Sequence, residues 1–479
     1  MDNFWLIMFV WVYLLITVAI WLYASRKVKT ENDYLIAWRS LPLYITIATV
    51  FATWFGSETV LGTSSTFIDE WLLGIMADPF GASLCLILVW LFFAKPLYKL
   101  WITTLWDFYK LKYGRTVEML ASICIMISYV GWISAQIVAL GIVFSVLSGW
   151  EISAFWGSWI WASIVLVYTF WGWMWSVALN DFVQMIMIFI WIVIATFFVT
   201  SWVEWWFWTI INHAIDNSKF DVFPEWFSIF ALIWILFALL TMWFWSIPQQ
   251  DVFQRVLSAK DEKTAKWWSV IGWSLYFIIA FLPIMLWYAA FIVAPEMVEK
   301  LWDSQLVLPT LILQSTPLII QIVFFGALIS AIMSTASATM LAPSALFAHN
   351  ILKPFLNLNE KQLLRLTRFV VVWCFVIVMW FVTYKFKNEE ANIFAMVENA
   401  YKITLAWAFF PLLAWIVVKK THTISGLLSL IFGIWIWIAM EIVNPEHSIP
   451  PQFWWLGASI IWFIVWQWLG KLYWPKDEK

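Results

Sequence analysis

The stretch ATVFATWFGSETVLG, residues 48–62, decides the fold because it interrupts an apolar run with the polar string GSET at residues 56–59. In hydrocarbon, irregular backbone persists only where it lines a protein cavity, because unsatisfied backbone groups are costly there. The string therefore predicts a discontinuous helix at membrane depth, with freed carbonyls that suit a desolvated cation. The alternative is an unbroken helix in which Ser57 and Thr59 bond back to their own turn. Glu58 favours the break, since intramembrane carboxylates usually face a cavity and mark a pathway.

Composition indicates that lipid is the main solvent of this chain. Of 479 residues, 64% are hydrophobic and 12% are charged, against about 25% charged in soluble domains. The formal net charge of −2 argues against a nucleic-acid partner. The sequence carries no recognisable nucleophile or metal-ligand constellation, so we expect a protein that is not an enzyme, and we expect no obligate protein partner.

The sequence predicts an all-α integral membrane protein with thirteen transmembrane helices. A span needs about 20 apolar residues, and the stretches that meet this rule are 4–24, 42–65, 72–94, 117–147, 152–171, 177–201, 227–247, 268–293, 316–348, 366–384, 393–418, 424–442 and 452–470. The first stretch lacks a basic leader and a small-residue cleavage site, so we expect it to be a retained span rather than a signal peptide.

Basic residues sort to one side of this predicted topology. With the N-terminus outside, the inner loops, including the loop that holds Arg255, carry 22 of the 27 Lys and Arg residues, the outer loops carry four, and Lys402 lies within a span. Because basic residues favour cytoplasmic loops, we expect a multi-pass protein of the cell membrane with its N-terminus outside and its C-terminus in the cytoplasm.

A second polar seam lies in the ninth predicted span, GALISAIMSTASATMLAPS, residues 326–344. Ala331, Ser334 and Thr335 stand at helical spacings of three and four residues, so they share one face. Two hydroxyls and a nearby carbonyl offer hard oxygen ligands without fixed charge, which suits a monovalent alkali ion better than a divalent one. The alternative is that small residues and hydroxyls merely permit close helix packing.

Several other polar residues fall within predicted spans. Asp181 lies near the inner end of the sixth span, where it could be functional or simply solvated at the interface. Glu398 and Lys402 are one turn apart and can neutralise each other, which favours a structural ion pair. Gln136 could line a cavity or bridge two helices. Asp78 precedes a proline near the start of a span, which favours a cap or a kink.

These residues occur within a set of motifs that resembles the sodium:solute symporter family, which includes bacterial sodium/proline, sodium/pantothenate and sodium/sugar symporters. The matching stretches are ATWFGSETVLGTSSTF, DYLIAWRSLPLY, WDFYKLKYGRTVE, SYVGWISAQIVALG, YTFWGWMWSVALNDFVQ, SIPQQDVFQRVLSAKDEKTA and SAIMSTASATMLAPS. The resemblance implies one polytopic transporter domain with discontinuous helices, built as a leading helix followed by a five-plus-five inverted repeat. The predicted units are 4–24, repeat one at 42–201, repeat two at 227–418 and two additional helices at 424–470.

The resemblance also implies a sodium site between the broken helix and the polar seam. Its positions in this chain are the carbonyls of Ala52, Phe55 and Ala331 and the hydroxyls of Ser334 and Thr335.

Two further positions bear on coupling and on specificity. Asp181 matches an acidic position of the family for which a role in coupling is suggested. In the sodium/proline branch an aspartate follows the broken-helix alanine by two positions. Here that position is Trp54 and the acid is Glu58, so the resemblance does not predict proline as the solute.

The expected function is sodium-coupled uptake of a small organic solute, such as an amino acid, a carboxylate or a sugar, by alternating access. We expect the solute near the midplane, next to Ser57, Glu58 and Gln136, with Asp181 and Lys402 as further candidates for the cavity or for coupling. One alternative is a proton-coupled transporter on the same fold in which Glu58 titrates. The other is a membrane sensor, which would need a signalling domain after the last span.

Tryptophan and glycine look exchanged in this sequence, which has 43 Trp and 16 Gly. Membrane helices pack through small residues and should be rich in Gly. Trp38, Trp173, Trp268 and Trp273 stand where the family pattern has Gly, and SWVEWWFWTI at 201–210 would be an ordinary Gly-rich loop with Gly in place of Trp. We hypothesise that UGA codons of this gene specify glycine in its organism and are written here as tryptophan. A real interfacial aromatic belt is the alternative.

The hypothesis matters for the seventh predicted span. By the inverted repeat this span should be interrupted like the second, yet its end, LLTMWFWSIPQQ, contains no Gly. Glycine at positions 243 and 245 would restore the expected break.

Overall fold

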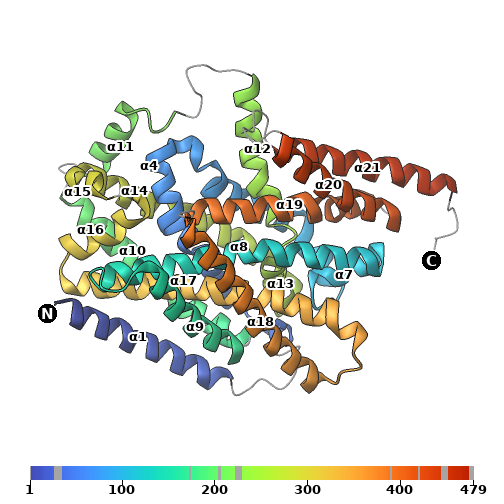
Figure 1. The fold of residues 1–479 in the computed structure, drawn as a ribbon, viewed down its shortest axis with the longest axis horizontal. Helices are drawn as coiled ribbons and strands as arrows, with labels where there is room; N and C mark the ends of the chain where they lie inside the picture. The colour runs from blue at the N-terminus through green and yellow to red at the C-terminus, as the bar shows by residue number, and fades with distance from the viewer. Residues whose placement is uncertain are drawn as a thin grey trace.

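The structure is a computed structural model, shown in Figure 1, and it describes residues 2–25, 35–171, 174–202, 206–221, 229–301, 303–388, 391–418, 421–443 and 451–473. Of the residues discussed above, Trp173 and Trp205 lie outside these ranges. So do some of the basic residues counted for the predicted topology, namely Arg26, Lys27, Lys29, Lys419, Lys420, Lys476 and Lys479.

Helices account for the regular structure of the described residues, and one isolated bridge joins Leu41 to Ala259. The long helices are α1 Asp2–Ser25, α3 Leu43–Trp54, α4 Thr63–Gly74, α8 Arg115–Leu147, α9 Ala154–Trp171, α10 Met174–Thr200, α11 Trp206–Asp216, α12 Ile229–Trp245, α14 Glu262–Val293, α17 Leu318–Leu346, α18 Glu360–Lys387, α19 Ile393–Val417, α20 Thr423–Val443 and α21 Pro451–Tyr473. The short α-helices are α5 Ala82–Leu88, α6 Ala94–Lys99, α7 Leu105–Tyr113, α13 Gln250–Ser258, α15 Pro295–Lys300 and α16 Val307–Ser315. Tighter or wider turns form η1 Ala37–Arg39, η2 Glu58–Gly62, η3 Met76–Gly81, η4 Val89–Phe93, η5 Ser304–Leu306, η6 Phe347–Leu352 and η7 Lys353–Phe355.

The described helices fit a polytopic membrane protein. Eight of them are long and apolar enough to cross a membrane, or up to ten if each bent pair forms one span. The predicted total of thirteen is therefore not confirmed by the length and composition of the described helices. The all-helical, multi-span fold class is confirmed.

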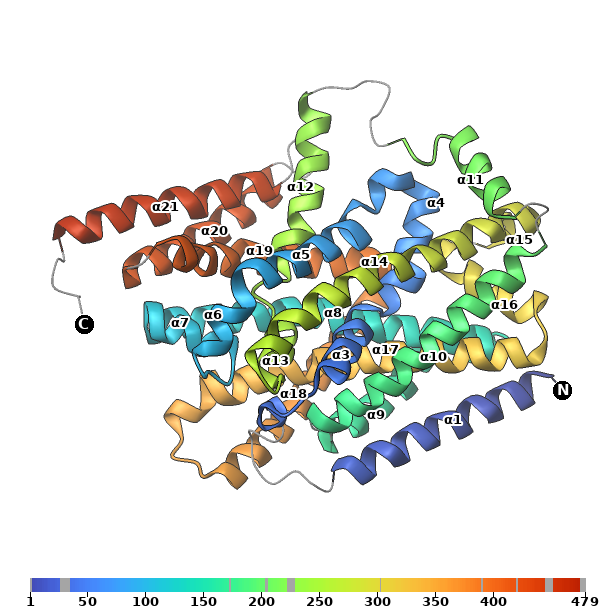
Figure 2. The same ribbon diagram turned by 180° about the vertical axis from the view of Figure 1, so that it is seen from behind.

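The broken helix lies in the middle of the bundle. α3 packs against α10, α14 and α17, while α8 packs against α9, α17 and α19. In Figure 2, α3 lies between α14 and α10 near the centre of the view, with α1 on one side of the bundle and the α20–α21 pair on the other. Residues 45–53 of α3 are buried. Residues of α3 and of the turn that follows it are therefore held inside protein rather than against lipid.

The segment after α12 corrects the expectation that Arg255 lies in an inner loop. Arg255 lies in the helix α13 and is 1% exposed. The helix α12 ends at Trp245, a turn follows, and α13 begins at Gln250. The seventh predicted span is thus followed closely by a break, and the short helix after it enters the core because its neighbours supply partners for its polar groups.

Four tryptophans adopt a backbone conformation that favours glycine. Seven non-glycine residues in the described ranges have positive φ, and four of them are tryptophans. These are Trp38, Trp71, Trp101 and Trp150, with φ of 49°, 64°, 54° and 69°. Trp71 combines its φ of 64° with ψ −162°, a region that residues with a Cβ essentially do not enter. The backbone at these positions is therefore strained by the side chain that the sequence assigns.

Candidate functional site

The second predicted span is broken where the sequence predicts it. α3 ends at Trp54, and Phe55 caps it with φ −82° and ψ 71°. The two halves, Leu43–Trp54 and Glu58–Gly74, are bent by 52° relative to each other. The Gly56 N–H bonds to the Trp54 carbonyl at 3.0 Å instead of continuing the helical ladder to Ala52. The Ala52 carbonyl is thereby released from its helical partner and can face another group.

Glycine at position 56 lets two helices approach the break closely. A Cβ at Gly56 would lie 2.9 Å from Oγ1 of Thr335 in α17 and 3.0 Å from Oε1 of Gln136 in α8. The first distance is shorter than real Cβ contacts and the second is at the limit, so a larger residue would force the Thr335 and Gln136 side chains to shift. The neighbouring Ser57 N–H donates to the same Gln136 oxygen at 3.1 Å, which makes Gln136 a bridge between α8 and the break.

The Thr335 hydroxyl meets the broken helix. Its Oγ1 lies 3.1 Å from the Ala52 carbonyl oxygen, 3.2 Å from that of Thr53 and 3.3 Å from that of Ala331 on its own helix. Thr335 is 1% exposed. A hydroxyl and three carbonyl oxygens thus converge at a dry position where α3 and α17 touch, which is a set of ligands suited to a monovalent cation.

A carboxylate lies next to this cluster. Asp181 in α10 is fully buried and accepts hydrogen bonds from the hydroxyls of Thr49 in α3 and Ser334 in α17. Ser334 therefore faces Asp181, one residue away from Thr335 and its carbonyls. The sequence prediction left Asp181 between function and interfacial solvation, and its burial against two hydroxyls excludes solvation.

Arg255 is a buried cation next to this cluster, although the sequence pattern placed it in an inner loop. Its guanidinium donates to the Asp251 carbonyl at 2.7 Å, to the Thr53 hydroxyl at 2.5 Å and to the Thr49 carbonyl at 3.4 Å. Thr49 also donates its hydroxyl to Asp181, so Arg255 and Asp181 share this neighbour. The available signal was the pair Asp251 and Arg255 at helical spacing in SIPQQDVFQRVLSAK, but a charge in a polar segment does not by itself indicate burial.

A second polar cluster lies just after the break. Glu58 accepts a hydrogen bond from the Tyr401 hydroxyl of α19. Asp78, in η3, accepts hydrogen bonds from the hydroxyls of Thr63 at 3.0 Å and Tyr276 at 2.5 Å, and Thr59 lies 3.1 Å from it. Asp78 has non-helical backbone angles, as the predicted kink requires, but it also belongs to this cluster, and Tyr276 and Tyr401 gave no sequence signal.

The remaining candidate, Lys402, forms the ion pair that its spacing predicts. Its Nζ lies 3.2 Å from Oε1 of Glu398 in the same helix.

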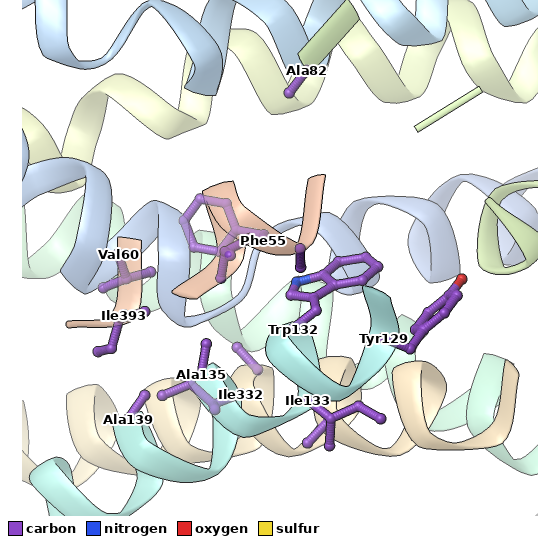
Figure 3. Close-up of a cluster of buried hydrophobic side chains, with 14 of the residues drawn as sticks. Phe55, Val60, Ala82, Tyr129, Trp132, Ile133, Ala135, Ala139, Ile332 and Ile393 are labelled. Carbon is purple, nitrogen blue, oxygen red and sulfur yellow. The ribbon is translucent and has the colours of Figure 1, made fainter. Parts of the chain in front are cut away.

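Figure 3 shows the apolar surroundings of the break, where Phe55 and Val60 lie close to Trp132 and Ala135 of α8 and Ile393 of α19. The structure thus brings Ala52, Ala331 and Thr335 together and sets Ser334 against Asp181 beside them. Phe55 caps α3 at the break, Ser57 and Glu58 follow it, and Gln136 contacts the break next to Thr335.

Comparison with known proteins identifies the family of this chain. The sequence profile of the sodium:solute symporter family matches residues 34–433. The chain belongs to the sodium:solute symporter family. Its membership, together with the apolar helices, makes it a multi-pass membrane protein of a transporter family, which supports the expectation that it is not an enzyme.

Relatives of this symporter-family chain transport different solutes. It is 27% identical to the high-affinity choline transporter 1 of Caenorhabditis elegans over 78% of the chain and 67% of that protein. It is 28% identical to the Drosophila melanogaster transporter of the same name over 71% of the chain and 55% of that protein, so the chain spans just over half of the latter's length. The sodium/glucose cotransporter of Vibrio parahaemolyticus is 21% identical over 73% of the chain and 68% of its own length.

Solved structures share the fold of this symporter-family chain. A Na+-coupled sialic acid symporter in a substrate-bound outward-open state superposes with a TM-score of 0.82 at 17% identity, covering 99% of this chain and 98% of the other. Mhp1, a nucleobase-cation-symport-1 family transporter, gives a TM-score of 0.60 at 14% identity, covering 94% and 98%.

Proposed function

We propose that this chain is a sodium-coupled symporter that carries a small organic solute into the cell by alternating access. The observation that carries the proposal is the meeting of Thr335 with the freed Ala52 carbonyl and the Ala331 carbonyl at the helix break, at 3.1 Å and 3.3 Å. Family membership supports sodium as the coupling ion.

In this proposal, sodium is held by the carbonyls of Ala52, Phe55 and Ala331 and by the hydroxyls of Ser334 and Thr335. The hydroxyl of Thr335 then rotates its hydrogen away from the carbonyls and presents a lone pair, so all ligands point oxygen at the ion. Asp181 and Arg255 lie behind these ligands, orient Ser334 and Thr53, and set the local charge. Because the ligands come from α3 and α17, sodium binding favours the arrangement in which these helices touch.

Coupling follows from the shared helix break. The solute is proposed to bind near Ser57, Glu58 and Gln136, on the segment whose shape depends on sodium at Ala52. By linkage, sodium must raise solute affinity by the same factor as solute raises sodium affinity. The named relatives carry choline, glucose or sialic acid, which supports a small organic solute without selecting one. The outside N-terminus and cytoplasmic C-terminus remain part of the proposal.

The test is the melting temperature of the purified protein in NaCl and in KCl at equal ionic strength. Sodium should raise the melting temperature over potassium, because a ligand that binds only the folded state stabilises it. Equal melting temperatures would contradict a sodium site. Uptake in proteoliposomes that is driven by a pH gradient without sodium would favour the alternative, a proton-coupled transporter using Glu58.

A further inference from the structure

We propose that Glu58 binds the protonated amine of the transported solute, within the buried polar cluster that it forms with Asp78, Tyr276 and Tyr401. This assignment rests on the proposed symport function, because it names the head group of the solute. It draws on the contacts of the helical turn that follows the break, which begins at Glu58.

Within the part of the chain that the structure describes, Glu58 and Asp78 are two buried carboxyl groups without a cationic partner. They are 6% and 0% exposed. Among the described residues, no ion pair joins either of them to a Lys, Arg or His. The nearby cation Lys402 is engaged with Glu398 at 3.2 Å. Buried charge is costly unless a charge of opposite sign compensates it, so an ionised Glu58 is stabilised when a cation from outside the chain binds to it.

The two carboxylates differ in how they are satisfied. Both oxygens of Asp78 meet hydroxyls, Oδ1 that of Tyr276 and Oδ2 those of Thr59 and Thr63. Glu58 meets the Tyr401 hydroxyl through Oε2 only. In the part of the chain that the structure describes, Glu58 Oε1 is buried with no hydrogen-bond partner, as are Ser57 Oγ and Gln136 Nε2 at the same break. The free acceptor on Glu58 identifies where the head group binds.

Aromatic rings frame the two carboxylates. Trp54 lies edge-on to Tyr276 at 6.0 Å between ring centroids, and Trp132 lies edge-on to Tyr401 at 6.4 Å. The two tyrosines of these pairs are the same ones that donate to Asp78 and Glu58. Aromatic faces attract cations, more strongly when water is excluded. Aromatic side chains next to carboxylates are typical of sites that bind ammonium groups.

The unpartnered Oε1 of Glu58 restricts which cationic head group can bind there. A trimethylammonium group supplies charge but no N–H, so it would leave Oε1 without a donor. A neutral alcohol supplies a donor but no charge. A protonated primary amine supplies both. Because Glu58 is closed off from solvent, the amine reaches it only when the helices move apart, as alternating access requires.

The experiment uses three series of small alcohols that differ only in their head group. Ethanolamine, 4-aminobutan-1-ol and 6-aminohexan-1-ol carry a primary ammonium at neutral pH, their N-trimethyl forms include choline, and the corresponding diols are neutral. Binding to the full chain in NaCl is measured by titration of the melting temperature, for the original protein, for Glu58→Gln and for Glu296→Gln. Glu296 is a surface carboxylate, with an 89% exposed side chain, so Glu296→Gln makes the same chemical change outside the site.

The expected result is that the primary ammonium form of at least one chain length binds about tenfold or more tightly than its two counterparts, since hydrogen bonds to charged groups have about this strength. Glu58→Gln should abolish this preference and Glu296→Gln should retain it. The assignment is overturned if no amine binds, if the trimethylated or neutral form binds as well, or if the preference survives in Glu58→Gln.

A sodium control separates the two proposals. The difference in melting temperature between NaCl and KCl, measured without solute on each variant, reports sodium binding. It also shows whether Glu58→Gln folds. An overturning result with an intact sodium shift refutes the amine assignment alone. If the original protein has the same melting temperature in NaCl and KCl, the proposed function is refuted instead.

Discussion

The hydroxyl of Thr335 in α17 donates to the carbonyl of Ala52 in α3 across 3.1 Å. This contact exists because the Gly56 N–H turns to Trp54 and releases the Ala52 carbonyl. Hydrogen bonds between helices in membranes are worth only about 0.6 kcal/mol on average. The contact is thus weak enough to open during transport, and an ion that replaces the hydroxyl hydrogen can decide whether α3 and α17 stay together.

Removing the Thr335 hydroxyl should weaken sodium binding. In Thr335→Ala the sodium concentration that gives half of the thermal shift should rise at least about tenfold, since supporting groups of metal sites already contribute 10–100-fold. Thr335→Ser retains the hydroxyl and should stay close to the original protein. An unchanged sodium response in Thr335→Ala would place the ion elsewhere.

Neutralising Asp181 should act on sodium through Ser334. Asp181→Asn keeps the size of the side chain but loses the charge that faces the Ser334 and Thr49 hydroxyls. We expect sodium affinity to fall by about 10–100-fold, measured by sodium titration of the melting temperature. The exposed Asp221 offers the control, because Asp221→Asn makes the same change at the surface. A similar loss in both variants would argue for a nonspecific effect of charge.

Adding a methyl group at Gly56 should separate the helices at the break. The Cβ of Gly56→Ala would approach Thr335 Oγ1 to 2.9 Å, and overpacking of this kind costs about 1–3 kcal/mol. Both thermal stability and the sodium shift should fall. At Gly457 in α21 a Cβ would meet nothing within 4 Å. Gly457→Ala should therefore leave the sodium shift unchanged, and equal behaviour of the two variants would contradict the close approach at Gly56.

The tryptophans at positive φ make a prediction about the gene. Codons 38, 71, 101 and 150 should be UGA, because the backbone at these positions suits glycine. Trp54 and Trp132 lie in helices and pack their rings against Tyr276 and Tyr401, so UGG is expected for both. UGG at the four positive-φ codons would refute the recoding hypothesis.

The same hypothesis can be checked on the protein. Replacing Trp by Gly at a position with positive φ removes a strain of about 1–3 kcal/mol. Trp71→Gly, the most extreme of the four, should raise the melting temperature. Trp132→Gly should lower it, because a buried ring is lost from a helix. A lower melting temperature in both variants would show that Trp71 is a genuine structural residue.

The break in the second span and the seam in the ninth were predictable because each depends on local chemistry. A run of Gly, Ser, Glu and Thr cannot continue an apolar helix without cost, and residues 331, 334 and 335 must share a face at helical spacing. The meeting of the two elements came only from family resemblance, since spacing alone could not place α3 against α17. Tyr276 and Tyr401 were not predicted, and Arg255 and Asp78 were assigned other roles. The contacts of these four residues depend on partners more than a hundred residues away or on burial that the sequence does not show.

By itself the sequence determined that this protein is embedded in the lipid bilayer. It also predicted an interruption of the second span at Gly56 and a hydroxyl-bearing helix face at Ser334 and Thr335, with oxygen atoms that could bind a monovalent cation. These properties follow from hydropathy and helical periodicity, which are local. Tertiary structure alone decided that Asp181 faces Ser334, that Arg255 is buried, and that Glu58 keeps one oxygen without a partner. Burial and pairing depend on which helices meet, and packing between distant segments sets that contact.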